Sequence, residues 1–215
     1  MCPVFAASVF ALAAGLNIRR EQFEVSLHLF ILGRKDEQII AVTYNGRTDV
    51  TDLTGDRKNG DHLLRLLTEY GISRVDSLYI AENADSSAAV YDKLLYACDV
   101  ECVMTATENE FPDDKYICSQ PLVDTDYCCI EASDYSTSVK DGCFSISAFG
   151  KSVFVTQQEP SEYTAAGYDY IVSGKNKKNT VFDMSGDTDK MVVSAGQNIE
   201  IIIHADSSVV ARRLD

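Results

Sequence analysis

Residues 77–95, SLYIAENADSSAAVYDKLL, contain the patterns of a strand, a turn and a helix in direct succession. Residues 75–81 form an apolar run typical of a buried strand, and residues 88–95 repeat apolar side chains at helical spacing. The polar turn between them offers Asp85 or Ser86 as the N-cap of the helix. In many hydrolases a turn at such a place carries histidine and aspartate ligands for a metal ion. This turn contains no histidine, so its role is the central question that the sequence raises.

Strand and helix patterns alternate on both sides of this turn. Apolar runs at 23–32, 38–44 and 46–53 predict three strands, and leucines at helical spacing predict a helix over residues 61–70. A second helix is predicted over residues 86–98, followed by a further strand. This order indicates helices packed on the outside of a sheet.

Strand patterns dominate the second half of the chain. The segment around Phe149–Gly150 predicts a tight hairpin, and a brief helix is expected at 161–166. The closing residues read as consecutive β-segments, and no internal repeat or low-complexity linker occurs. Together with the first half, this order predicts an α/β fold in which two mixed sheets face each other.

The composition indicates one acidic globular domain. The chain has 215 residues, of which 46% are hydrophobic, and 33 acidic against 19 basic residues give a net charge of −14. Such a field repels phosphate backbones, so direct DNA binding over the whole surface is not expected. The basic cluster Lys175, Lys177 and Lys178 is interpreted as a solvated loop.

No motif in the chain predicts a bound cofactor, metal ion or catalytic nucleophile. The seven cysteines form no CxxC pair, and most are expected to be reduced core residues, with a disulfide among some of them left open. His28, His62 and His204 fall in separate predicted elements, which argues against a shared metal site. Neither a GxSxG elbow nor a GxxxxGK[ST] loop is present.

Three aspartates recur near the predicted loop that follows residue 53. Asp49, Asp52 and Asp56 could chelate a hard cation, but Arg57 and Lys58 lie in the same loop. We interpret these aspartates as part of a solvated acidic turn.

The N-terminal residues differ from the rest of the chain. The first 16 residues carry no charge, and Arg19 and Arg20 follow them closely. The run is shorter than the ~20 apolar residues that span a bilayer, so residues 1–20 are interpreted as an apolar leader, either the end of a membrane segment or a small anchor. A buried amphipathic helix is the alternative. The protein is therefore expected to be membrane-associated, with the side of the membrane open.

Three short stretches resemble a known family. FILGRKDEQII places Gly33 and Asp36 where the family has a DVGQGDA-like turn, and VTDLTG places Asp52 and Gly55 in a liDtG-like element. YGISRVDSLYI follows the family's yGi..iD.l.l stretch. On these residues the chain from 22 to 215 resembles the C-terminal metallo-β-lactamase-like domain of ComEC-type competence proteins, which are membrane channels of bacterial DNA uptake. The resemblance implies a shortened αββα sandwich with two mixed sheets.

The same resemblance implies a metal-binding turn that this chain has lost. In the family, the strand after yGi..iD ends in T-H-x-H/D-x-D-H, which holds zinc or manganese ions. Laid on this sequence, the turn has Glu82 and Ser87 at the outer histidine positions, and no shift of the alignment recovers an imidazole. Gln158 replaces the family's metal-bridging aspartate. The degenerate site positions are Asp52, Glu82, Ala84, Asp85, Ser86, Ser87 and Gln158.

Three functions of different class follow from these observations. The preferred one is a non-catalytic domain associated with a ComEC-type DNA-uptake membrane protein, with a structural role or a role in binding the channel domain or other uptake proteins. A metal-dependent phosphodiesterase or nuclease with an unrecognised ligand set is the second. The third is a membrane-tethered interaction module unrelated to DNA. The absent histidines argue against the enzyme, so no catalytic residue, metal or small-molecule substrate is predicted.

Overall fold

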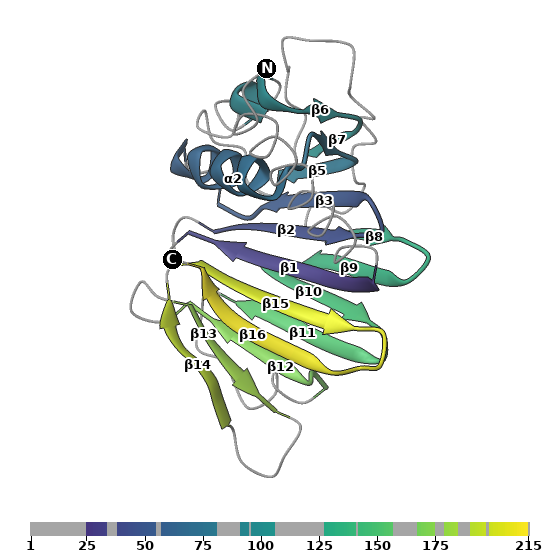
Figure 1. The fold of residues 1–215 in the computed structure, drawn as a ribbon, viewed down its shortest axis with the longest axis vertical. Helices are drawn as coiled ribbons and strands as arrows, with labels where there is room; N and C mark the ends of the chain where they lie inside the picture. Colours follow the sequence, from purple (N-terminus) through teal and green to yellow (C-terminus); the bar gives the residue numbers. More distant parts are fainter. Residues whose placement is uncertain are drawn as a thin grey trace, which may run out of the picture.

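The computed structural model consists mainly of two β-sheets that face each other (Figure 1). It describes residues 25–33, 38–54, 57–80, 91–94, 96–105, 127–140, 142–156, 167–174, 179–184, 190–196 and 198–214. Each of the two facing sheets has seven strands, and a separate pair is formed by β4 (Arg74–Val75) and β6 (Asp99–Val100).

The first sheet joins the N-terminal strands to the last two strands of the chain. Its order is β16-β15-β1-β2-β3-β5-β7. The pairs from β16 to β3 are antiparallel, whereas β3, β5 and β7 run parallel, so the sheet is mixed as predicted. The bounds are β1 (Ser26–Leu32), β2 (Ile39–Tyr44), β3 (Arg47–Asp52), β5 (Ser77–Ile80), β7 (Val103–Thr105), β15 (Asn198–His204) and β16 (Val209–Leu214).

The second sheet is built entirely from the second half of the chain. Its order is β14-β13-β12-β11-β10-β9-β8, and only β11 and β12 are parallel neighbours. The predicted hairpin at Phe149–Gly150 is confirmed: both residues have positive φ, 51° and 73°, as a type I′ turn requires. The bounds are β8 (Tyr127–Glu131), β9 (Tyr135–Lys140), β10 (Cys143–Ala148), β11 (Lys151–Thr156), β12 (Tyr170–Ser173), β13 (Asn179–Asp183) and β14 (Lys190–Gly196).

Both faces of strand β1 are buried. Leu27, Leu29 and Ile31 belong to the core between the two sheets. Phe30 and Leu32 alternate with them and belong to a second core beneath helix α2. Every residue of the strand is buried, which explains its nearly continuous hydrophobic sequence.

Helix α2 (Arg57–Tyr70) covers part of the outer face of the first sheet. Leu63, Leu66 and Leu67 recur at helical spacing and pack into this outer core, as the sequence predicts. The helix begins at Arg57, four residues before the predicted start at residue 61. The predicted second helix is confirmed where the structure describes it, at residues 91–94 and 96–97.

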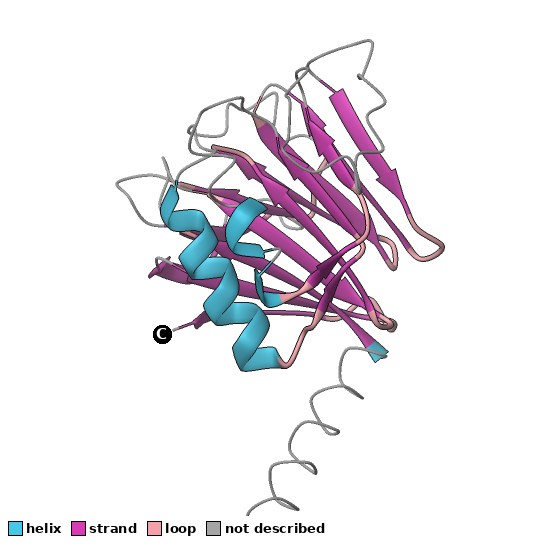
Figure 2. Ribbon diagram, turned by 90° about the horizontal axis from the view of Figure 1, so that it is seen from above, coloured by secondary structure: helices cyan, strands magenta, loops and turns pink. Residues whose placement is uncertain are grey.

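The predicted αββα sandwich is wrong, because the chain is mostly β and lacks the second helix layer in its described part. Within the described ranges, helices lie only on the side of the first sheet (Figure 2). The outward residues of β9 and β10 explain the difference: Ser136, Ser138, Ser145 and Ser147 are polar and at least partly exposed. A sheet face lined with serines can meet water and needs no helix over it.

The predicted leader, residues 1–20, lies outside the described residues. Among the helices that the structure does describe, none is long and apolar enough to cross a membrane.

Candidate functional site at the amide edge

Of the degenerate positions singled out by the sequence, the structure describes Asp52, which lies at one edge of the sandwich. Asp52, the last residue of β3, pairs with Ile39 of β2 and with Ile80 of β5. Ile80, the last described residue before the segment that contains Glu82, is thus paired with Asp52. The other degenerate positions lie outside the described residues: Glu82, Ala84, Asp85, Ser86, Ser87 and Gln158.

Asp52 is fully buried and hydrogen-bonded to the first turn of helix α2. Its Oδ1 accepts the side-chain amide of Asn59 at 3.0 Å and the backbone N–H of Thr54 at 3.3 Å. The same Asn59 nitrogen also donates to the hydroxyl of Thr54 at 3.0 Å. These bonds join the end of β3 to the start of the helix, which explains why the helix begins before its leucines do.

A second polar group at this edge links the two sheets. Gln38, which precedes β2, donates from Nε2 to Oδ1 of Asn179 in β13 at 2.7 Å. Asn179 in turn donates from Nδ2 to the carbonyl of Gly33 at 3.0 Å, and the Gly33 N–H donates to Asn198 Oδ1 at 3.0 Å. We call Gly33, Gln38, Asn179 and Asn198 the amide edge. Gln38 and Asn179 have no exposed surface.

The amide edge consists of neutral groups that bond to one another, except that the buried Oε1 of Gln38 has no hydrogen-bond partner among the described residues. A side-chain amide both donates and accepts, so a chain of amides can be buried without a net charge. Gly33, with φ of +86°, occupies a turn conformation that favours glycine. In the described ranges, no three His, Cys, Asp or Glu side chains come together in a way that could hold a metal ion.

The sequence places the histidines in separate elements, but the structure brings two of them onto adjacent strands. β1 pairs with β15, so His28 and His204 lie near each other. His28 Nδ1 donates to Glu200 at 2.7 Å, and His204 Nδ1 lies 2.6 Å from the hydroxyl of Ser26. Arg212 donates to the second oxygen of Glu200 at 2.5 Å.

Glu200 is a buried carboxylate held by two basic side chains. Burial by itself would raise the pKa of Glu200, but the hydrogen bonds from His28 and Arg212 outweigh it and lower that pKa. The group is therefore ionised at neutral pH and connects β15 to both of its neighbouring strands. Sequence spacing could not reveal it, because Glu200 lies 172 residues from His28.

A buried carboxylate cluster at the opposite end of the sandwich was not expected. Asp49 is only 3% exposed, and its carboxylate accepts hydrogen bonds from Ser77 at 2.5 Å, from Arg47 at 2.8 Å and from Tyr135. Burial, together with the charge of Asp49, raises the pKa of Tyr135, so its hydroxyl remains a donor. Asp49 and its three donors, Arg47, Ser77 and Tyr135, are called the carboxylate cluster, although Asp49 is its single carboxylate.

The interpretation of the aspartates as a solvated turn is wrong for two of the three. Asp49 and Asp52 are buried strand residues, and Asp56 lies outside the described residues. The sequence does not distinguish a buried aspartate from a solvated one unless its partner is known. For Asp49 that partner, Tyr135, is 86 residues away and belongs to the other sheet.

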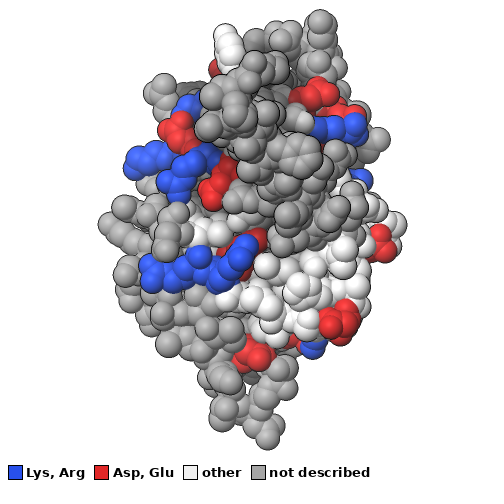
Figure 3. Space-filling model, in the orientation of Figure 1, with Lys and Arg blue, Asp and Glu red and all other residues white. Residues whose placement is uncertain are grey.

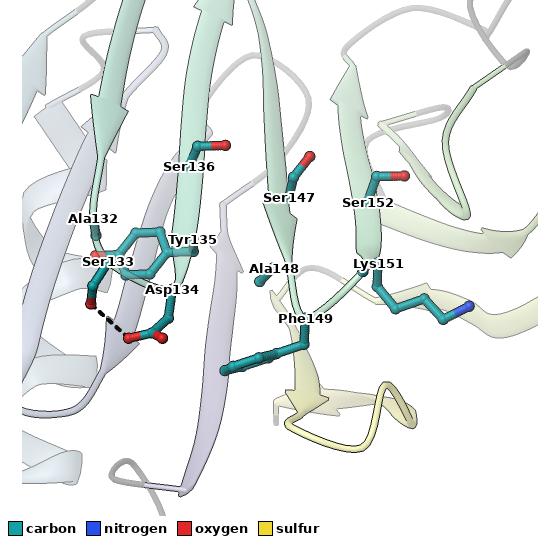
Figure 4. A pocket seen from close by; sticks show the side chains of 11 residues that line it. Ala132, Ser133, Asp134, Tyr135, Ser136, Ser147, Ala148, Phe149, Lys151 and Ser152 are labelled. Atoms are coloured by element: carbon teal, nitrogen blue, oxygen red, sulfur yellow. Dashed lines mark hydrogen bonds between the residues drawn. The ribbon is translucent and has the colours of Figure 1, made fainter.

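A shallow pocket of about 500 Å³ lies over the hairpins of the second sheet, near the carboxylate cluster (Figure 4). Ser136, Ser147 and Ser152 line it in cross-strand register. Asp134 accepts a hydrogen bond from Ser133 at 2.6 Å, and Lys151 points away from the serines toward its ion pair with Asp169. The lining combines these serine hydroxyls with apolar side chains such as Phe149, and its charged groups, Asp134 and Lys151, already have partners.

Searches of protein-family models and of curated proteins find no match to this chain. The described polar geometry consists of a buried network of neutral amides at one edge and a buried carboxylate with its donors at the other.

Proposed function

We propose that this chain is a non-catalytic domain that acts by contact with a partner and is associated with a ComEC-type DNA-uptake membrane protein. The observation that supports the non-catalytic part is the amide edge, where Gln38 and Asn179 bond to each other across the two sheets. The DNA-uptake part rests on the three sequence stretches that resemble the family. Fold does not determine function, so this second part needs its own test.

Metal-dependent hydrolysis of a phosphodiester needs a cation that activates water and offsets charge on the phosphate. Such a cation needs several ionised or imidazole ligands, held in place by further hydrogen bonds. At this edge Asp52 is engaged by Asn59 and Thr54, and the neighbouring polar groups are neutral amides. These bonds favour a role in holding the sheets together.

The charge of the chain favours a protein partner over DNA. A net charge of −14 repels a phosphate backbone and attracts a surface rich in lysine and arginine. The cytoplasmic loops of membrane channels commonly carry such an excess of basic residues. We therefore propose the channel portion of the uptake protein as the partner.

The proposal is tested by two assays on the full chain. The first incubates it with single-stranded and duplex DNA plus excess zinc, manganese or magnesium, and we expect the DNA to remain intact. The second mixes it with the detergent-solubilised membrane portion of a ComEC-type channel, and we expect the two to co-elute on size-exclusion chromatography at low salt and to separate at high salt.

Each failure has a distinct meaning. Metal-dependent cleavage that disappears in a Glu82→Ala/Asp85→Ala variant, but persists in the distant Asp206→Ala control, would replace the proposal with a phosphodiesterase. Intact DNA combined with separate elution at every salt concentration would contradict the uptake association and favour a tethered module unrelated to DNA.

A further inference from the structure

Hairpin turns from both sheets meet at the end of the sandwich that holds the carboxylate cluster. The first sheet contributes the β2–β3 turn after Tyr44 and the β15–β16 turn at Ser207. The second sheet contributes the β8–β9 turn (132–134) and the β10–β11 turn at Phe149. Ser207 donates from its hydroxyl to the carbonyl of Phe149 at 2.6 Å, and the rings of Tyr44 and Phe149 meet edge to face with centroids 5.4 Å apart. The position of Phe149 is therefore fixed by contacts from the other sheet.

The shallow pocket of about 500 Å³ opens between the β8–β9 and β10–β11 turns (Figure 4). Small-molecule sites commonly have volumes of about 300–1,000 Å³, so a small ligand fits a pocket of this size. One part of its wall carries hydroxyls, from Ser136 and Ser147 on the outer face of the second sheet. Another part is apolar, because Ala148 and Phe149 lie in or against the core between the sheets. The pocket therefore offers hydrogen-bonding groups and an apolar surface to the same ligand.

Two hydroxyls in this wall are available to a ligand. Ser136 and Ser147 pair across β9 and β10, and both residues are exposed. Among the described residues, neither side chain makes a hydrogen bond. Ser152, the next serine in the same cross-strand row, differs from them because its hydroxyl donates to Asp169 at 2.9 Å. Hydrogen bonds from a ligand can therefore be formed by Ser136 and Ser147 without breaking one within the protein.

The pocket carries no net charge. Its lining includes one acidic and one basic side chain, and both have partners: Asp134 accepts a hydrogen bond from Ser133 at 2.6 Å, and Lys151 forms an ion pair with Asp169 at 3.2 Å. On the face of the molecule that Figure 3 draws, a largely uncharged area over β1, β15 and β16 extends toward the same hairpin turns. Neither an anion nor a cation meets an unpaired opposite charge in this lining, so the ligand that fits it is uncharged.

We propose that this pocket binds an uncharged sugar residue of a glycan. A sugar ring presents C–H groups on one side and hydroxyls around its rim, which matches the apolar wall at Phe149 and the hydroxyls of Ser136 and Ser147. A hydroxyl both donates and accepts, so each serine can pair with a sugar hydroxyl in either sense. A purely apolar ligand would remove water from these serines without replacing its hydrogen bonds. Because Phe149 is held in place before binding, little conformational entropy is lost.

This sugar site goes beyond contact with a protein partner and does not depend on the DNA-uptake association. Its test is an array of neutral cello-, chito-, manno- and galacto-oligosaccharides, together with sulfated and sialylated glycans, probed with the labelled full chain. The neutral glycan that binds most strongly is then titrated in solution by calorimetry. The test variant is Ser136→Ala/Ser147→Ala. The matched control is Ser138→Ala/Ser145→Ala, one row further along the same strands, where the two hydroxyls bond to each other at 2.7 Å outside the pocket.

We expect the wild type to bind at least one neutral glycan, and the Kd of the test variant to rise about tenfold or more through two lost hydrogen bonds. The control should stay within about twofold of the wild type, because its serines lie outside the pocket. Binding to no neutral glycan would overturn the sugar site. Binding restricted to sulfated or sialylated glycans would also overturn it, as would equal affinities in the two variants. If circular dichroism shows that the test variant does not fold, Ser147→Gln replaces it, since the longer side chain fills the pocket and should weaken binding as strongly.

Discussion

The two ends of the sandwich join the same pair of sheets with different chemistry. At the amide edge, Gln38 reaches Asn179 through a bond between neutral groups. At the opposite end, Tyr135 of the second sheet donates to the buried carboxylate of Asp49. Both contacts cross from one sheet to the other, and both are buried. The comparison shows that the cross-sheet contact is made by neutral amides at one end and by a buried carboxylate at the other.

The largest expected effect comes from removing the charge of the carboxylate cluster. Asp49→Ala leaves the hydroxyls of Ser77 and Tyr135 buried without their acceptor. Breaking a buried charged network of this kind costs about 3–5 kcal/mol in the free energy of unfolding. Urea unfolding followed by circular dichroism measures the change.

The control is Asp61→Ala, which breaks the exposed ion pair with Lys93 and should cost less than about 1 kcal/mol. If Asp49→Ala does not fold, Tyr135→Phe keeps the carboxylate and should cost about 1–2 kcal/mol through the single lost hydrogen bond. A Tyr135→Phe protein as stable as the wild type would show that this contact does not join the sheets.

An intermediate effect is expected at the amide edge. Asn179→Ala removes the acceptor of Gln38 and the donor to the carbonyl of Gly33. Leaving these buried neutral groups unsatisfied should cost about 1–3 kcal/mol. The neighbouring, partly exposed Thr180→Ala is the control and should change the free energy of unfolding by less than about 0.5 kcal/mol. Equal losses in the two variants would contradict the cross-sheet role of Asn179.

The smallest expected effect is a change in how the free energy of unfolding depends on pH, and it concerns the charged contact of Glu200. The pKa of Glu200 in the folded protein is below its ordinary value of 4.5. A lowered pKa contributes stability that is present above the ordinary value and is lost as the pH falls through the folded value. Glu200→Gln should therefore weaken the loss of stability on acidification below 4.5, when it is compared with the wild type.

The matched control for this titration is Glu69→Gln, an exposed glutamate on helix α2. Its unfolding at low pH gives the effect of exchanging an exposed glutamate for glutamine, against which Glu200→Gln is compared. If Glu200→Gln lost stability below pH 4.5 as steeply as the wild type does, His28 and Arg212 would not stabilise the carboxylate.

Local patterns in the sequence predict the elements well where one periodicity dominates. The leucines of α2, the apolar run of β1 and the Phe149–Gly150 hairpin are each decided by residues close together in the chain. The prediction of a second helix layer is wrong for a different reason. It came from the resemblance, although the alternating serines of YSTSVK and CFSISA already indicate a sheet face that meets water.

The polar contacts could not be predicted, because each joins residues far apart in the chain. Gln38 and Asn179 are separated by 141 residues, and Asp49 and Tyr135 by 86. A single sequence shows that such residues are polar but not which one faces which. The bond between Asp52 and Asn59 depends on a helix that starts earlier than its leucines indicate, so it could not be predicted either.

The proposed non-catalytic role depends most directly on whether the edge beside Asp52 holds a metal ion. Elemental analysis of the purified, dialysed full chain after exposure to zinc or manganese is the decisive measurement. With neutral amides at the edge and Glu82, Ala84, Ser86 and Ser87 in the turn, we predict far less than one equivalent of metal per chain. One equivalent of zinc or manganese retained by the wild type and lost in Glu82→Ala would contradict the non-catalytic role and support the metal-dependent phosphodiesterase instead.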